Sequence, residues 1–120
     1  MRWSTDEANH HMLIHLEGIF NSNAVVGVRR FFGQYLDHDK DIVINMDDVE
    51  SIDLAGVRFL DQFYRHLLDY GCSLILINPN KRVAKTLETT HLGLWISSYA
   101  TVDSYLARHD HTGKYFRAVY

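Results

Sequence analysis

Cysteine, proline and long apolar runs are scarce in this chain of 120 residues. The one cysteine, Cys72, has no partner within the chain, which argues against a disulfide-stapled secreted protein and favours the reducing cytoplasm. No stretch reaches the roughly 18 apolar residues of a membrane-spanning helix, so we expect a soluble protein without direct membrane insertion. A net charge of −3 supplies no basic surface, which argues against nucleic-acid binding.

The apolar content of the chain, 47% hydrophobic residues, is sufficient for a packed core without a disulfide or metal ion. Its length of 120 residues suits one compact domain. Residues 110–120 show no strand or helix period. We therefore expect a single domain over residues 1–109, followed by a C-terminal tail over residues 110–120.

Several stretches have the apolar spacing or the continuous apolar character of strands. They are residues 2–5, 10–16, 42–46, 73–77 and a short stretch around 95–99. The first two are separated by a polar turn at 6–9 and predict a hairpin, and Gly18 is expected to end the second strand. Strands 42–46 and 73–77 are apolar throughout, which is typical of strands buried on both faces of a parallel sheet. A loop is expected at 47–53.

Segments with helical spacing separate these strands. Helices are expected after the capping residues 21–23 with an end near Asp37, from the N-cap Asp53 to Asp69, over 81–89, and after Thr101. The apolar stripe of the second helix is Val57, Leu60, Phe63, Tyr64, Leu67 and Leu68. The alternation of buried strands and amphipathic helices predicts an α/β domain: a mixed, mostly parallel sheet of about five strands with an N-terminal hairpin, and about four helices.

The residues around the second helix resemble the signature of the STAS family. Residues 41–46 match the buried strand of that signature, and Asp53-Leu54-Ala55-Gly56 matches the D-[S/T]-[S/A]-G turn that opens the family's second helix. Segments 16–21, 71–79 and 89–94 resemble further parts of the family pattern in the same order. The resemblance covers roughly residues 10–108.

The resemblance implies a non-enzymatic regulatory protein of the bacterial cytoplasm. Soluble members of the family are anti-sigma-factor antagonists that bind a kinase-like anti-sigma factor and displace the sigma factor. Phosphorylation of the hydroxyl residue after the aspartate turns this binding off. Here Leu54 occupies that position without a hydroxyl, and Asn21 stands where the family has an acid. The expected partner-binding residues are Asn21, Ser22, Asp53, Leu54, Ala55, Gly56, Val57 and Arg58.

The chemistry of a helix start agrees with a docking role. Unpaired N–H groups and a partial positive charge gather there, and Asp53 can cap them. A phosphate beside the Asp53 carboxylate would disrupt a snug interface. Ala55 and Gly56 have almost no side chain, so a partner backbone could approach closely. Leu54 forms either an exposed apolar tip or an inward hydrophobic staple, and the alternative phosphate acceptors are Ser22, Ser51, Thr89 and Thr90.

Other functions stay open at this point. STAS domains also serve as subunits of lipid- or anion-transport complexes, so the protein partner is an anti-sigma factor or a transporter component, and a homodimer also stays open. The eight histidines suggest a small metal-dependent hydrolase as a further alternative. On a strand, however, His11 and His15 would lie about 13 Å apart, too far to share one metal ion. Catalytic sequence fingerprints are absent, so we expect no metal, no cofactor and no enzymatic activity.

Overall fold

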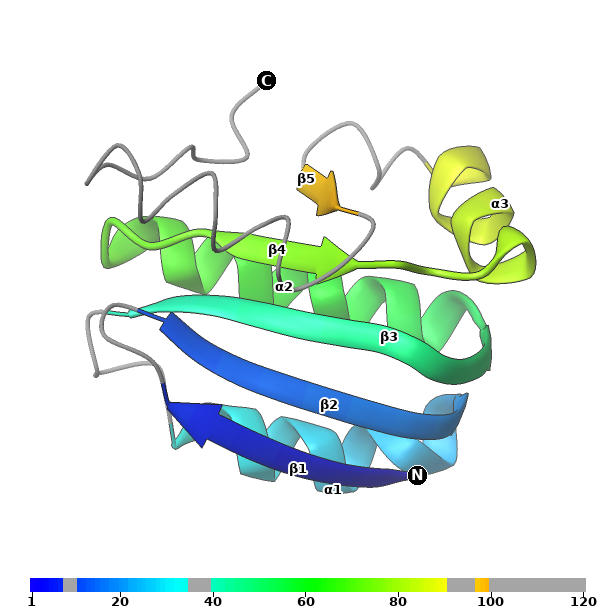
Figure 1. Cartoon of the computed structure of the whole chain (residues 1–120), viewed down its shortest axis with the longest axis horizontal. Coiled ribbons are helices and arrows are strands. Elements are labelled where there is room, and N and C mark those ends of the chain that lie inside the picture. Colours follow the sequence, from blue (N-terminus) through cyan, green and yellow to red (C-terminus); the bar gives the residue numbers. More distant parts are fainter. Residues whose placement is uncertain (8–10, 35–39, 91–96, 100–120) are drawn as a thin grey trace.

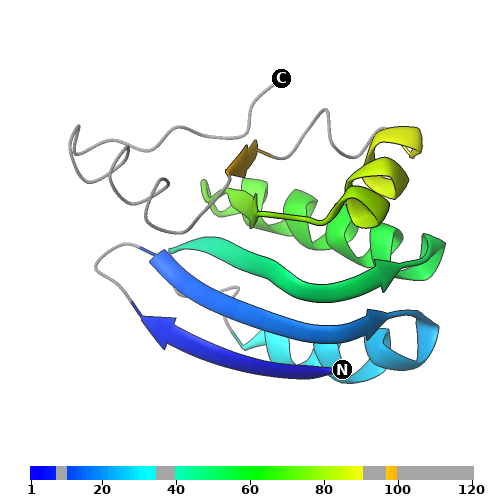
Figure 2. The ribbon, with the colours of Figure 1, turned by 45° about the vertical axis from the view of Figure 1, so that its right-hand side comes forward.

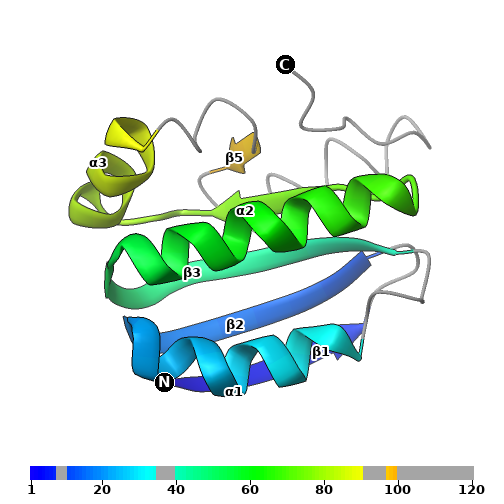
Figure 3. The same ribbon diagram turned by 180° about the vertical axis from the view of Figure 1, so that it is seen from behind.

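The computed structural model of the chain describes residues 1–7, 11–34, 40–90 and 97–99. In chain order the elements are β1 (Arg2–Glu7), β2 (His11–Phe20), α1 (Ser22–Gly33), β3 (Asp41–Ile52), α2 (Leu54–Asp69), β4 (Leu74–Ile77), α3 (Lys81–Thr89) and β5 (Ser97–Tyr99). The strands form one sheet in the order β1-β2-β3-β4-β5. Helices α1 and α2 lie side by side on one face of this sheet (Figure 1 and Figure 3).

The sheet is mixed and mostly parallel, as predicted. Strand β1 pairs antiparallel with β2, whereas the pairs β2–β3, β3–β4 and β4–β5 are all parallel. Figure 2 shows β1 at one margin of the sheet, with β2 and β3 beside it in turn. The predicted α/β class, the N-terminal hairpin and the five strands are therefore confirmed. The helix expected after Thr101, the tail 110–120 and residues 95–96 lie outside the described residues.

The core lies between the sheet and the two helices. Phe32 of α1 contacts Phe63 and Phe59 of α2, with ring centroids 4.8 and 5.4 Å apart. Phe59, which the predicted stripe omitted, is 4% exposed, whereas Leu68 was expected in the stripe and is 42% exposed. The buried face of α2 is broad in its first turns and narrows to Leu67 alone in the last turn, which leaves Leu68 in solvent.

Strand β3 is much longer than predicted. The expected loop at 47–53 is wrong, because β3 continues from the apolar run to Ile52. Within this second half Val49 and Ile52 are buried while Asp47, Asp48 and Glu50 are exposed. The backbone there pairs with β2, after a register irregularity between His15 and Glu17. Pairing with β2, which is distant in the chain, thus holds the acidic second half of β3 in an extended conformation.

Three other boundaries also differ from prediction. Gly18 does not end β2, because its φ of +114° allows the strand to pass a second register irregularity and reach Phe20. The expected turn at 6–9 is wrong for Asp6 and Glu7, which pair with β2. Helix α1 ends at Gly33 with Gln34 as its C-cap, before the expected Asp37, since glycine is a poor helix former.

Candidate functional site

The start of α2 is fixed by three hydrogen bonds of Asp53. The residue has an extended conformation, and its carboxylate accepts from the backbone N–H of Gly56 at 3.0 Å. Its carbonyl accepts from the N–H of Val57 at 3.0 Å. Its own N–H donates to the carbonyl of Phe20 at 3.1 Å, which ties the helix start to the end of β2. The predicted N-cap role of Asp53 is confirmed.

The start of α1 is built in the same way and lies next to the start of α2. The Asn21 side chain accepts from the backbone N–H of Ala24 at 3.1 Å and caps α1. Asn21 follows Phe20, and Asp53 follows Ile52; Phe20 and Ile52 are neighbours in the β2–β3 register. Both helices therefore begin at the carboxyl-terminal edge of the sheet, as Figure 3 shows.

Leu54 is the exposed apolar residue of this edge. As the first residue of α2 it is 52% exposed, so the alternative of an inward hydrophobic staple is wrong. Arg58 lies one turn further along α2 and is exposed, and Ser22 is exposed at the first turn of α1. Ala55 and Asn21 are half-buried. We call Asn21, Ser22, Asp53, Leu54, Ala55 and Arg58 the helix-start surface.

Gly56 and Val57 belong to the interior. Val57 is 4% exposed. A Cβ at Gly56 would lie 2.7 Å from a side-chain carbon of Ile52, 2.8 Å from the carbonyl oxygen of Phe20 and 2.9 Å from its ring. The small size of Gly56 therefore serves the packing of α2 against β2 and β3, and the expected approach of a partner backbone at this residue is wrong. Both residues are buried, so neither is available to a partner.

Two exposed apolar residues near this edge were missed from the sequence. Ile19 at the end of β2 is 50% exposed, and Val26 of α1 is 70% exposed. Val26 lies one turn after Ser22, so both lie on the same face of α1. Helical spacing around the buried Val25 and Val28 was the available signal for Val26, because it places Val26 off the core-facing stripe.

Two of the alternative phosphate acceptors are engaged within α3. The hydroxyl of Thr89 donates toward the carbonyls of Lys85 and Thr86, and the hydroxyl of Thr90 toward those of Thr86 and Leu87. These bonds satisfy carbonyls at the end of the helix. Ser51 is half-buried in β3. Ser22 and Thr89 are both exposed, and of these two Thr89 is the one whose hydroxyl is engaged with helix carbonyls.

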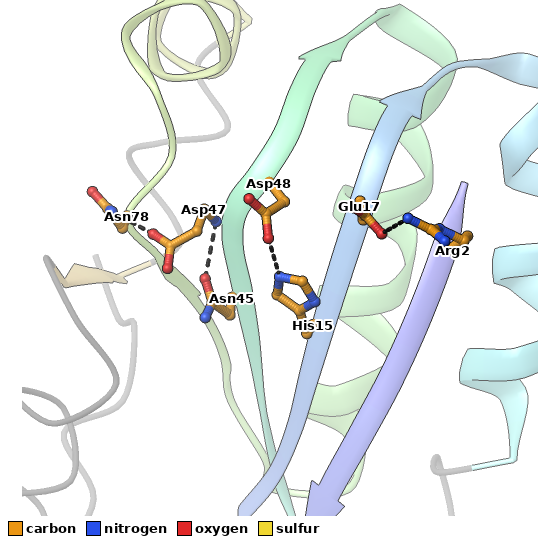
Figure 4. A network of polar contacts seen from close by, with 7 residues as sticks. All are labelled: Arg2, His15, Glu17, Asn45, Asp47, Asp48 and Asn78. Atoms are coloured by element: carbon orange, nitrogen blue, oxygen red, sulfur yellow. Dashed lines mark hydrogen bonds and ion pairs between the residues drawn. The ribbon is translucent and has the colours of Figure 1, made fainter.

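The face of the sheet opposite the helices carries a polar network (Figure 4). His15 Nε2 and a carboxylate oxygen of Asp48 lie within hydrogen-bond distance at 2.7 Å, and Arg2 and Glu17 form an ion pair at 2.6 Å. Asp47 accepts from the side chain of Asn78, and its backbone N–H donates to the side chain of Asn45 at 2.9 Å. The His15–Asp48 and Arg2–Glu17 contacts join solvent-accessible side chains of neighbouring strands, and such contacts contribute little stability individually.

The histidines of the described residues do not converge. His11 is buried in β2, His15 pairs with Asp48, and His66 is exposed on α2. Within the described ranges no group of three or more His, Cys, Asp or Glu side chains could hold a metal ion. The other histidines, His10, His38, His91, His109 and His111, lie outside these ranges. In the same described part, no helix is long and apolar enough to cross a membrane.

Three solved structures have the same fold. One is a Thermotoga maritima protein described as an anti-sigma factor antagonist, with a TM-score of 0.81 and 19% identity over 88% of this chain and 92% of that one. Another is the anti-sigma factor antagonist SpoIIAA in its unphosphorylated form, with a TM-score of 0.77 and 22% identity over 96% of this chain and 100% of that one. The third is the Bacillus cell fate determinant SpoIIAA in its phosphorylated form, with a TM-score of 0.70 and 22% identity over 89% and 98%.

At these identities the likeness establishes the fold alone. A search of the curated proteins found no match. The sequence itself matches the family model of the STAS domain over residues 2–105, which includes every residue of the helix-start surface. With that match spanning most of the chain and the fold in agreement, this protein belongs to the STAS domain family.

Proposed function

We propose that this chain is a regulatory protein-binding module of the anti-sigma-factor antagonist type. It docks onto a kinase-like anti-sigma factor through the helix-start surface. The observation that carries the proposal is the 52% exposure of Leu54 at the capped start of α2. The structural likeness to anti-sigma-factor antagonists supports the choice of partner class.

Leu54 gives this surface an apolar centre with polar groups around it. Asp53 directly precedes Leu54 in the chain, and Arg58 lies one helical turn after Leu54 along α2. Covering the exposed part of a leucine contributes about 1 kcal/mol of binding free energy. The partner chemistry that fits is an apolar hollow that receives Leu54, with polar groups at its rim.

The surface is also rigid before binding. Asp53 and Asn21 anchor the starts of both helices by side-chain caps, and the Asp53 N–H is bound to β2. A preordered surface loses little conformational entropy when it docks. Because Leu54 has no hydroxyl, a kinase cannot add phosphate there, and the surface stays competent for binding.

A pair of leucines on α2 allows a matched test. Leu54→Glu places a carboxylate at the centre of the surface, whereas Leu68→Glu makes the same change at the far end of the helix, where Leu68 is 42% exposed. Purified kinase-like anti-sigma factors from the same cell are titrated with each variant by calorimetry. We expect Leu54→Glu to weaken binding by about tenfold or more, or about 1.4 kcal/mol, and Leu68→Glu to leave it unchanged.

The same titration also tests the loss of the phosphate switch. With ATP present, the wild-type complex should persist, and mass spectrometry should find no phosphate on the chain. Equal binding by the Leu54→Glu variant and the wild type would remove the helix-start surface as the docking site. Binding to a transporter component instead of any anti-sigma factor would reassign the module to a transport complex.

A further inference from the structure

The first strand is a long, open edge of the sheet. Among the described elements β1 pairs only with β2, and all six of its residues are exposed. The backbone N–H and C=O groups on its outer side are therefore directed away from the sheet. Sheet edges are commonly blunted by proline, a bulge or charged side chains, and β1 carries the three charged residues Arg2, Asp6 and Glu7. β1 has no proline, and its pairing with β2 is unbroken from Arg2 to Glu7.

Two of the three charges of β1, Arg2 and Asp6, are arranged symmetrically about Ser4, and the third, Glu7, forms an ion pair with Lys40. Arg2 and Asp6 each lie two residues from Ser4, on opposite sides of it. Because side chains alternate between the faces of a strand, Arg2, Ser4 and Asp6 all lie on the same face. This is the face opposite the helices, since Trp3 contacts α1. A two-fold rotation about Ser4 exchanges the positions of Arg2 and Asp6, so each charge falls on the position of the opposite charge.

We propose that β1 pairs antiparallel with β1 of a second copy of this chain, with Ser4 facing Ser4. In this register Arg2 of each copy lies opposite Asp6 of the other. The two sheets join into one continuous sheet across a two-fold axis that is perpendicular to it. The Arg2 side chain is 81% exposed beside Glu17, so its remaining guanidinium N–H groups are available to a second carboxylate.

The charges select this register over its neighbours. A two-fold axis perpendicular to the sheet keeps each face on its own side, so the register can shift only by moving the centre to the next residue. Centred on Trp3, Arg2 would face Ser4 and Asp6 would have no opposite residue in the strand. Centred on Thr5, Asp6 would face Ser4 and Arg2 would be left over. Of these three registers, only the one centred on Ser4 pairs both Arg2 and Asp6 of each copy.

Trp3 adds an apolar contact on the helix side. It stacks on Phe31 of α1 with ring centroids 5.1 Å apart, and a Cβ at Gly27 would lie 3.1 Å from its ring. Trp3 is nevertheless 37% exposed, which is a large exposed fraction for an aromatic residue that packs on a helix. In the proposed register it lies opposite Thr5 of the second copy, a cross-strand pair of the stabilising aromatic and β-branched kind.

A charge exchange tests this pairing. Asp6→Arg places arginine opposite Arg2 of the second copy, and Arg2→Asp places aspartate opposite Asp6. Sedimentation equilibrium of the full chain from about 1 µM to 1 mM should show a wild-type dimer. We expect each single variant to raise the dimer dissociation constant by about tenfold. An equimolar mixture of the two variants should dimerise as well as the wild type, because aspartates then face arginines at every charged position.

Matched changes on α3 provide the control. Glu88→Arg and Arg82→Asp make the same two kinds of charge reversal, acidic to basic and basic to acidic, at exposed positions of α3 that are far along the chain from β1. Both variants should leave the dimer unchanged. Circular dichroism verifies that each variant is folded. The proposal is overturned if the wild type stays monomeric, which would leave the edge to a strand of a different protein. A dimer that ignores the reversals, or a mixture that fails to associate, overturns it equally.

Discussion

Asp53 and Gly56 hold the first turn of α2 from opposite sides. The Asp53 carboxylate accepts the Gly56 N–H, while the Cα of Gly56 packs against Phe20 and Ile52 with no room for a side chain. Leu54 lies between them in the chain and is half exposed. The hydrogen bond and the close packing that fix this turn therefore involve residues 53 and 56, and neither involves the side chain of residue 54.

Two glycines on the helices should respond oppositely to alanine. At Gly56 a methyl group would meet the Phe20 carbonyl oxygen at 2.8 Å, and no side-chain rotation relieves a backbone contact. We expect Gly56→Ala to lower the free energy of unfolding by about 1–3 kcal/mol. At Gly33 no atom lies within 4 Å of the added Cβ, and Gly33→Ala should raise it by about 0.5–1 kcal/mol. Urea unfolding measures both changes.

Equal stability of the two glycine variants would contradict the tight packing under α2. A Gly56→Ala variant that folds normally but loses its partner would instead restore the direct contact that we exclude. Partner titration of the same samples therefore separates a packing role of Gly56 from a binding role.

At the scale of elements, Asn80 joins α3 to the long strand β3. Its side-chain oxygen caps α3 by accepting from the Val83 N–H at 2.8 Å. Its side-chain amide donates to the carbonyls of Val49 and Glu50 at 3.0 and 3.2 Å. One side chain thus provides hydrogen-bond partners both for an N–H group at the start of α3 and for two carbonyl groups in the second half of β3.

Replacing this amide by a carboxylate should separate the two roles. Asn80→Asp keeps the cap acceptor but removes both donors to β3, so we expect a loss of about 1–2 kcal/mol in the free energy of unfolding. The matched control is Asn21→Asp, because among the described residues the Asn21 side chain serves only as the cap acceptor of α1. That variant should be unchanged or gain about 0.5 kcal/mol from the helix dipole. Equal losses in both variants would contradict the bridging role.

The elements that could be predicted from the sequence are those with a local signal. The caps Asn21 and Asp53 and the helical stripe of α2 located both helix starts, because capping and amphipathic spacing act within a few residues. The second half of β3 was missed, because its carboxylates disfavour a strand and its hydrogen bonds come from β2 and Asn80, which are both distant in the chain. The role of Gly56 was missed for the same reason, since Phe20 is remote in the chain.

At the scale of the whole molecule, the two proposed surfaces use different parts of the sheet. The helix-start surface lies at the carboxyl-terminal edge, where β2 and β3 pass into α1 and α2. The dimer contact uses the outer side of β1, and its charged residues are Arg2 and Asp6. No residue belongs to both sets, so a dimer would present two docking surfaces at once.

The two activities should therefore be independent. Leu54→Glu should dimerise with the wild-type dissociation constant, measured by sedimentation equilibrium. Arg2→Asp should bind one anti-sigma factor per chain with an affinity within about twofold of the wild type, measured by calorimetry on dilute samples. Loss of partner binding in the Arg2→Asp variant would show that docking requires the dimer.

In the first turn of α2, the residues that fix the fold differ from the exposed residue 54, and this difference bears on how such sequences diversify. The cap acceptor and the missing side chain are fixed by folding, so an Asp-x-x-Gly tetrad reports architecture whatever the protein does. The residue that follows the aspartate is under no such constraint. If the proposed function holds, a version of this surface that a kinase can phosphorylate at position 54 and the present version differ by one substitution, and that substitution leaves the contacts of residues 53 and 56 in place.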